Sequence, residues 1–206
     1  MKQIIITTIL VAIAISGVYG QKANRKPKPM PRQRPTATST EAPKTSSITG
    51  FRIGIKVMDS HKTTIGGGAQ FGIDTGATFC VDAKLGESYL PPNPPAGLPD
   101  LRFANPRGKH DDCFDLGINN DYRPYRNAEQ SDTFKVLFQA PADGYPITVS
   151  WDALATHFKG DVTLRSPLSG KALNVDMKKE TTATLTEDFT AFYIIASKPV
   201  ITAKKK

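Results

Sequence analysis

The sequence predicts an all-β domain in which two antiparallel sheets pack as an immunoglobulin-like sandwich. Apolar and polar residues alternate in short runs, as in FRIGIKVMD at 51–59, where Ile53, Ile55 and Val57 fall on one face. Clusters of Gly, Pro, Asn, Asp and Ser separate these runs. Alternation with a period of two is the pattern of half-buried strands, and many short strands divided by turn signals are typical of sandwiches.

Nine segments show the strand pattern, and one other segment is compatible with a helical turn. The expected strands are residues 51–59, 69–74, 101–104, 132–139, 146–151, 161–165, 172–177, 181–186 and 191–197. DALATHF at 152–158 is long enough for one or two helical turns. Residues 73–126 are rich in Pro, Gly, Asn and Asp, so we expect a long irregular insertion within the sandwich.

The first twenty residues have the three parts of a secretion signal. Lys2 gives a positive start, residues 4–15 are apolar, and small residues such as Gly20 close the segment. A membrane-spanning helix needs about 20 predominantly apolar residues, and this run is shorter. We therefore expect cleavage after Gly20 and a secreted, cell-surface or periplasmic protein that meets the membrane only through this transient signal. An uncleaved anchor is the alternative.

The basic charge of the chain is concentrated outside the predicted domain, which we place at residues 49–198. Residues 21–48 hold seven Lys/Arg and one Glu among Pro, Thr and Ser, and the tail at 199–206 ends in three lysines. Residues 49–203 hold sixteen Lys/Arg and eighteen Asp/Glu. The domain is thus close to neutral, and no nucleic-acid partner is expected. Residues 21–48 fit an extended linker, either a solubilising spacer or an electrostatic attachment to anionic cell-surface polymer or lipid headgroups.

Both cysteines fall within the irregular insertion. Cys80 and Cys113 are 33 residues apart, and an even number of cysteines in an exported chain favours a disulfide. Metal ligation is the alternative, but His61, His110 and His157 do not combine with the cysteines in a metal-binding spacing.

Two groups of residues are candidates for ligand contacts. The first is DYRPYR at 121–126, in which aromatic rings and cations could together bind a sugar; its residues are Tyr122, Arg123, Tyr125 and Arg126. The alternative is that the two tyrosine rings cover the edge of the sandwich. Acidic residues of the insertion are candidates for calcium, although their spacing does not match an EF-hand; they are Asp74, Asp82, Glu87, Asp111 and Asp112. Trp151, at the end of an alternating run, is expected in the core rather than on a binding surface.

The motifs of the common hydrolases and nucleotide-binding proteins are missing. The sequence has no G-x-S-x-G, no H-E-x-x-H and no Lys-Ser/Thr after Gly66–Gly68. The acidic cluster near Cys113 fits turn-forming residues. We therefore expect no catalysis and no cofactor.

Several motifs together resemble a β-sandwich module that recurs in secreted and surface proteins of the Bacteroidetes and Chlorobi group, often near type IX secretion components. The similar motifs are FGIDTGAT at 71–78, LGESYLPPNPPAGLPDLRF at 85–103, GYPIT at 144–148 with Trp151, and VDM at 175–177. The resemblance implies an accessory sandwich module without a catalytic residue set.

Two features depart from that module. Phe79 and Cys80 stand where the module has Asp-Gly, so the cysteine pair is particular to this chain. No separate sorting domain follows residue 197, so export by type IX secretion is left open. We expect a secreted or cell-surface module with an adhesive or structural role, whose partner is a cell-surface polymer, a glycan or another secreted protein. The alternatives are a carbohydrate-binding module and a self-associating subunit of an extracellular assembly.

Overall fold

The computed structural model describes residues 50–104, 116–166, 173–186 and 189–201. All of them belong to one unit of the chain, Thr45–Lys206. The predicted signal peptide and the linker at 21–48 lie outside the described residues. The described part contains no α-helix, and its strands are β1 Phe51–Met58, β2 Ala69–Asp74, β3 Asp100–Ala104, β4 Asn120–Pro124, β5 Ser131–Gln139, β6 Ile147–Trp151, β7 Val162–Arg165, β8 Asn174–Asp176, β9 Thr182–Leu185 and β10 Ala191–Ser197.

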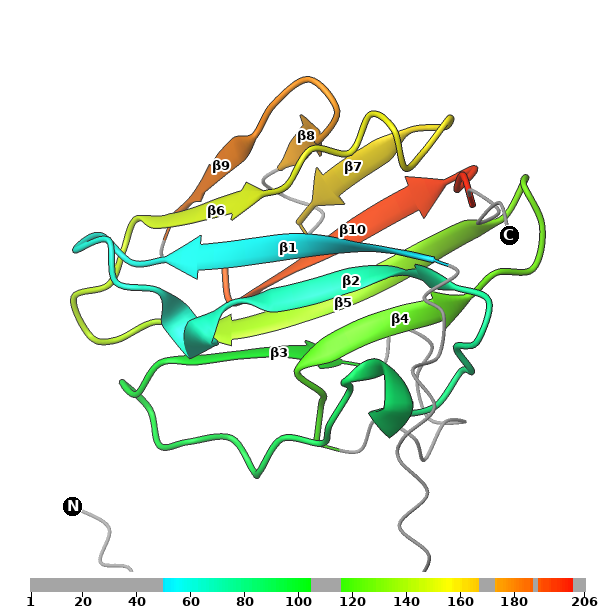
Figure 1. Ribbon diagram of the computed structural model, residues 1–206. Helices are drawn as coiled ribbons and strands as arrows, with labels where there is room; N and C mark the ends of the chain where they lie inside the picture. Colours follow the sequence, from blue (N-terminus) through cyan, green and yellow to red (C-terminus); the bar gives the residue numbers. More distant parts are fainter. Residues whose placement is uncertain (1–49, 105–115, 167–172, 187–188, 202–206) are drawn as a thin grey trace, which may run out of the picture. The chain divides into compact units, whose positions relative to one another are not determined.

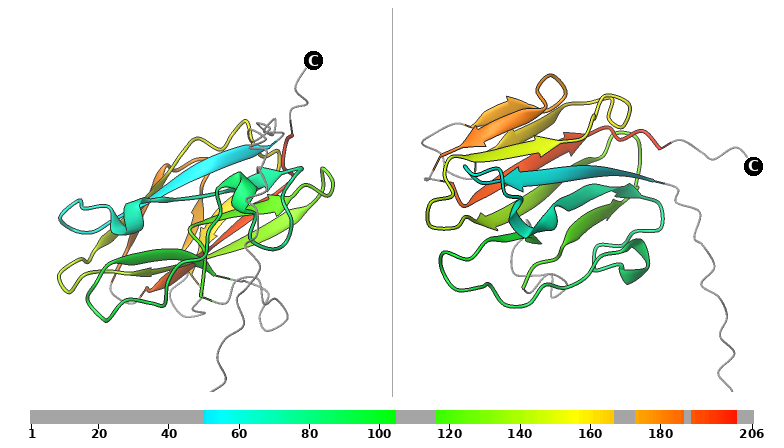
Figure 2. Two further views of the ribbon diagram at one scale, coloured as in Figure 1. Left: turned by 60° about the horizontal axis from the view of Figure 1, so that its bottom comes forward. Right: turned by 60° about the vertical axis from the view of Figure 1, so that its left-hand side comes forward.

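The strands form two five-stranded sheets that pack face to face. Sheet A has the order β4-β2-β1-β6-β9, and sheet B has the order β3-β5-β10-β7-β8. Figure 1 shows sheet A in front of sheet B, with β1 and β2 passing over β10 and β5, and Figure 2 shows the same two layers from other directions. The prediction of a two-sheet β-sandwich is confirmed.

Alternating side chains fill the space between the sheets. Ile53, Ile55 and Val57 of β1 are buried, and they pack with Phe71 of β2 and Phe134 of β5 in one continuous core. Trp151 is also buried in this core, and its Nε1 donates hydrogen bonds to the carbonyl oxygens of Met177 and Glu180 at 2.9 and 3.1 Å. The role that the sequence predicts for Trp151 is therefore confirmed.

One pair of strands departs from the predicted antiparallel order. β2 and β4 pair in parallel, from Gln70 opposite Asn120 to Asp74 opposite Pro124, so sheet A is mixed. Parallel neighbours need a long crossover connection, and the insertion between β2 and β4 provides it. The insertion is therefore less irregular than expected, because it contains β4 in addition to β3, the strand predicted at 101–104.

The short helical elements also differ from the prediction. Residues 152–158 form turns and a bridge, without a helix. Two single 3-10 turns occur elsewhere, η1 at Ile65–Gly67 and η2 at Ala83–Leu85. Within the described ranges, no helix is both long enough and apolar enough to cross a membrane.

Candidate functional site

Small and polar residues line a groove on the outer face of sheet A. Alternation along β1 buries Ile53 and Ile55 and turns Arg52, Gly54 and Lys56 outward. The pairing of the strands then places Gly54 beside Gln70, Gln70 beside Asn120, and Lys56 beside Ser150. The groove has a volume of about 660 Å³ and is lined by Gly54, Ile55, Lys56, Gly66, Gly67, Gly68, Ala69, Gln70, Asn119, Asn120, Ser150, Trp151 and Asp152.

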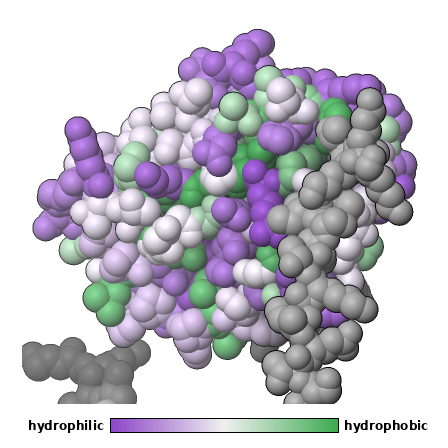
Figure 3. All heavy atoms as spheres, viewed as in Figure 1, coloured by the Kyte–Doolittle hydropathy of each residue, from purple (hydrophilic) through white to green (hydrophobic). Residues whose placement is uncertain are grey.

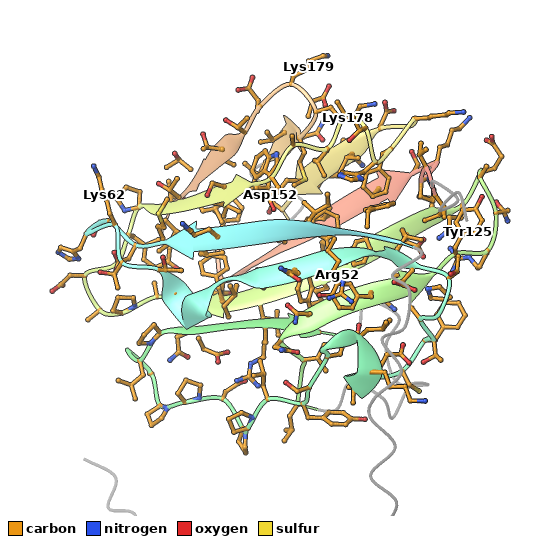
Figure 4. All side chains as sticks on the ribbon, in the orientation of Figure 1. Arg52, Lys62, Tyr125, Asp152, Lys178 and Lys179 are labelled. Carbon is orange, nitrogen blue, oxygen red and sulfur yellow. The ribbon has the colours of Figure 1, made fainter. Side chains whose placement is uncertain are left out.

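Gly54 and Asp152 together shape the floor of the groove. The backbone N–H of Gly54 donates to Oδ2 of Asp152 at 2.8 Å, and the N–H of Asp152 donates to the carbonyl oxygen of Gly54 at 3.1 Å. A Cβ at residue 54 would lie 2.7 Å from that carboxylate oxygen. Glycine at this position therefore lets the carboxylate of Asp152 fold over the strand. Figure 4 labels Asp152 on one side of β1 and Arg52 on the other.

Three consecutive glycines form the wall of the groove beside η1. Gly66, Gly67 and Gly68 have φ angles of +63°, +73° and +93°. These angles lie in the left-handed region, which residues with a Cβ adopt only at an energetic cost. The glycine run therefore lets the chain turn sharply from η1 into β2 and leaves this wall without side chains.

Amide side chains hold the opposite wall in place. Oδ1 of Asn120 accepts a hydrogen bond from the Gln70 N–H at 2.9 Å, and Nδ2 of Asn120 donates to the Gly86 carbonyl oxygen at 3.1 Å. Oδ1 of Asn119 accepts from the N–H of Ser88 at 2.7 Å. These contacts fix the two asparagines without a ligand, so this wall is preorganised.

Other polar groups of the groove remain available to a ligand. Within the described part of the chain, no hydrogen bond or ion pair involves the Lys56 ammonium or the Ser150 hydroxyl. Lys56, Gln70 and Asp152 are exposed. The face of sheet A in Figure 3 is accordingly mostly hydrophilic or neutral, with hydrophobic residues scattered singly. The groove thus offers a cation, amides, a hydroxyl and a carboxylate on a sheet surface.

Tyr122, predicted as an exposed sugar platform, is buried. It lies on β4 rather than in a loop, and only 2% of the residue is exposed. Its hydroxyl donates to Oε1 of Gln70 at 2.7 Å, and the Arg52 guanidinium lies over its ring at 4.6 Å. Burial raises the pKa of Tyr122 above its ordinary value. Since Gly72, between Arg52 and Tyr122, has no side chain, the arginine can reach across β2 and cover the ring.

The other three predicted ligand residues point to different places. Arg123 is 1% exposed and pairs with Asp121 at 2.6 Å inside the sandwich. Tyr125 is half-buried and packs against the core. Arg126 is exposed and forms an ion pair with Asp132 at 2.8 Å. Together with Tyr122, these residues do not converge on one ligand surface. Alternation along β4 sends Tyr122 and Arg123 to opposite faces, and residues 125 and 126 lie beyond the end of the strand.

The acidic candidates for calcium instead bind main-chain N–H groups. Oδ1 of Asp74 accepts from the Gly76 N–H at 2.8 Å, and Oδ2 of Asp82 accepts from the Thr78 N–H at 2.6 Å. Glu87 accepts from the N–H groups of Asp82 and Tyr122, both at 2.6 Å. Burial, as the largest effect, raises the pKa of Glu87. The described residues contain no cluster of three or more potential metal ligands, and Asp111 and Asp112 lie outside them.

The predicted disulfide involves one described cysteine. Among the described residues no cysteine is free. Cys113 lies outside those residues, so its pairing with Cys80 stays a prediction. The backbone N–H of Cys80 donates to Oγ1 of Thr78 at 3.1 Å, which places Cys80 in the turn that Asp82 stabilises.

Comparison with known proteins gives no family. No family model, no curated protein and no solved structure matches the chain. The groove therefore has to be assessed from its own chemistry. Sequence reasoning missed it, although two signals were present: the outward-facing Gly54 and Lys56 on a strand with an apolar inner face, and the glycine run at 66–68.

Proposed function

We propose that this domain is a non-catalytic binding module of an exported protein and that the groove on sheet A holds a hydroxyl-rich ligand, such as a cell-surface glycan. The observation that supports the proposal is the exposed polar lining. Lys56, Gln70 and Asp152 are exposed and Ser150 is half-buried, and together they present donors and acceptors across neighbouring strands. Gln70 contributes its Nε2 donor, because its Oε1 already accepts from the Tyr122 hydroxyl. Sugars are bound through such convergent hydrogen bonds, and a fixed wall lowers the entropic cost of binding.

The chemistry of the lining also favours binding over hydrolysis. Of the described residues that line the groove, Asp152 alone carries a carboxylate. Glycosidases generally need two carboxyl groups, one as acid and the other as base or nucleophile. The carboxylate of Asp152 already accepts a hydrogen bond from Gly54, so its proposed role is to orient a ligand hydroxyl.

The sequence resemblance supports an accessory role outside the cell. The acidic residues of these motifs stabilise the insertion, because Asp74, Asp82 and Glu87 accept hydrogen bonds from backbone N–H groups. Such a module attaches a larger assembly to a surface polymer or contributes to its architecture. Export through the predicted signal at 1–20 and the adhesive role belong to this proposal.

Binding to a panel of soluble polysaccharides and oligosaccharides, measured by glycan array and calorimetry, tests the proposal. We expect the double variant Lys56→Ala/Ser150→Ala, which removes two lining groups that form no hydrogen bond within the described residues, to lose binding. Lys135→Ala, on the outer face of sheet B, is the matched control and should bind as the unchanged chain does. A chain that binds no glycan, or that binds one equally well in the double variant, would exclude the groove. Release of a hydrolysed product would exclude the non-catalytic role.

A further inference from the structure

The outer edges of the two sheets differ in how their main-chain groups are satisfied. An edge strand with unpaired N–H and C=O groups is a template for another strand, and proteins usually block it. The four outer edges here are β4 and β9 in sheet A and β3 and β8 in sheet B. Three of them are closed by features of the fold.

On β4, no outward-pointing main-chain N–H group is free to bond to another strand. The Asn120 N–H donates to Oδ1 of Asn119 at 2.9 Å, and the Tyr122 N–H donates to Oε1 of Glu87 at 2.6 Å. Pro124 has no N–H. This edge therefore cannot form a regular ladder with another strand.

The two edges of sheet B are blocked in other ways. On β3, Phe103 exchanges both of its main-chain hydrogen bonds with Ile118, at 2.8 and 2.9 Å. On β8, which is three residues long, the Asp176 carbonyl oxygen accepts from the N–H groups of Lys179 and Glu180. On either edge, a partner strand would find only isolated main-chain N–H and C=O groups to bond to.

The edge of β9 is open in the described part of the chain. The Trp151 N–H donates to the Thr181 carbonyl oxygen, so residues 181, 183 and 185 are the ones that bond to β6. The N–H and C=O groups of Thr182 and Thr184 therefore point away from the sheet, and no hydrogen bond within the described residues engages them. Their side chains are exposed, while Ala183 and Leu185 are buried.

We propose that β9 is an association edge through which two copies of this chain pair antiparallel about Ala183. In this register Thr182 of each copy faces Thr184 of the other, and each such pair exchanges two main-chain hydrogen bonds. The strand is its own complement, as a two-fold symmetric interface requires. Its residues, TATL, include no charge and no proline that would oppose pairing.

The residues of β9 also suit pairing with a second copy. Each hydrogen-bonded pair in this register joins threonine to threonine, and cross-strand Thr–Thr pairs stabilise a sheet. A two-fold axis at Ala183 supplies both pairs at once, which favours a second copy over an unrelated strand.

Two charge variants test both the partner and the register. Thr182→Lys/Thr184→Lys puts like charges opposite each other at both cross-strand pairs, and Thr182→Lys/Thr184→Glu puts opposite charges there. Sedimentation velocity on the full chain should show a concentration-dependent dimer that the first variant weakens about tenfold. The second variant should strengthen it. Thr133→Lys/Thr163→Lys, on the outer face of sheet B, controls for the added charge.

Amide hydrogen exchange supplies a second readout. We expect the Thr182 and Thr184 amides to become protected as the protein concentration rises, while the Ala183 and Leu185 amides, bonded to β6, are protected throughout. A chain that is monomeric at every concentration, with fast exchange at both threonines, would overturn the proposal. So would a dimer that neither charge variant affects.

Discussion

Arg102 and Asp100 form a two-point ion pair on β3, with Nε to Oδ2 at 2.6 Å and Nη2 to Oδ1 at 2.8 Å. The remaining guanidinium nitrogen donates to the carbonyl oxygens of Pro91 and Leu116. Arg102 is 2% exposed. One buried side chain thus connects both the proline-rich segment and the approach to β4 to sheet B, which gives a structural reason for the Asp and Arg in the sequence DLRF at 100–103.

Arg102→Ala should therefore be strongly destabilising. Removing one member of a buried ion pair costs about 3–5 kcal/mol, and this change also leaves two carbonyl oxygens without their donor. Chemical denaturation followed by tryptophan fluorescence measures the loss. Arg165→Ala, an exposed arginine on β7 of the same sheet, should change the free energy of unfolding by less than about 0.5 kcal/mol. Equal effects of the two variants would contradict the anchoring role.

Substitutions of Tyr122 distinguish a structural role of this residue from a role in ligand binding. Tyr122→Phe removes the hydrogen bond to Gln70 and should cost about 1 kcal/mol of stability, whereas Tyr122→Ala should cost about 3–5 kcal/mol because it empties a buried site. Thermal unfolding of both variants tests this. If Tyr122→Ala left stability intact and abolished binding to a glycan, the tyrosine would be a ligand contact after all.

Glu87 should make stability depend on pH. Burial raises its pKa above the ordinary value of 4.5, so the folded chain binds this proton more tightly than the unfolded chain. The stabilising contribution is complete below pH 4.5 and is lost as the pH rises through the folded pKa. Glu87→Gln removes this titration. The difference in unfolding free energy between the two chains should therefore change across that window, and a constant difference would refute the assignment.

The predicted disulfide has a chemical and an energetic signature. Under non-reducing conditions, neither Cys80 nor Cys113 should react with iodoacetamide in the unfolded chain. Closing a loop of 33 residues stabilises a fold by roughly 3–4 kcal/mol in the chain-entropy model. Reduction should lower stability by about that amount, and Cys80→Ser and Cys113→Ser should match each other. Alkylation before reduction would contradict the pairing.

The strands could be predicted from the sequence because their alternating pattern is local. Nine predicted segments correspond to nine of the ten strands, since a strand with one buried face repeats its apolar residues every second position. β4 was not predicted, because Asp121 and Arg123 occupy its inner positions, where apolar residues are expected. They neutralise each other across 2.6 Å, so a polar segment lies inside the sandwich.

The sequence alone thus determined the two-sheet sandwich and the burial of Trp151. Only the tertiary structure decided that Tyr122 is covered by Arg52, that small and polar residues of neighbouring strands meet in a groove, and that β9 keeps an open edge. The reason is physical. Alternation depends on residues two positions apart, whereas coverage, grooves and edges depend on which distant strands become neighbours, and a single strand does not encode its neighbour.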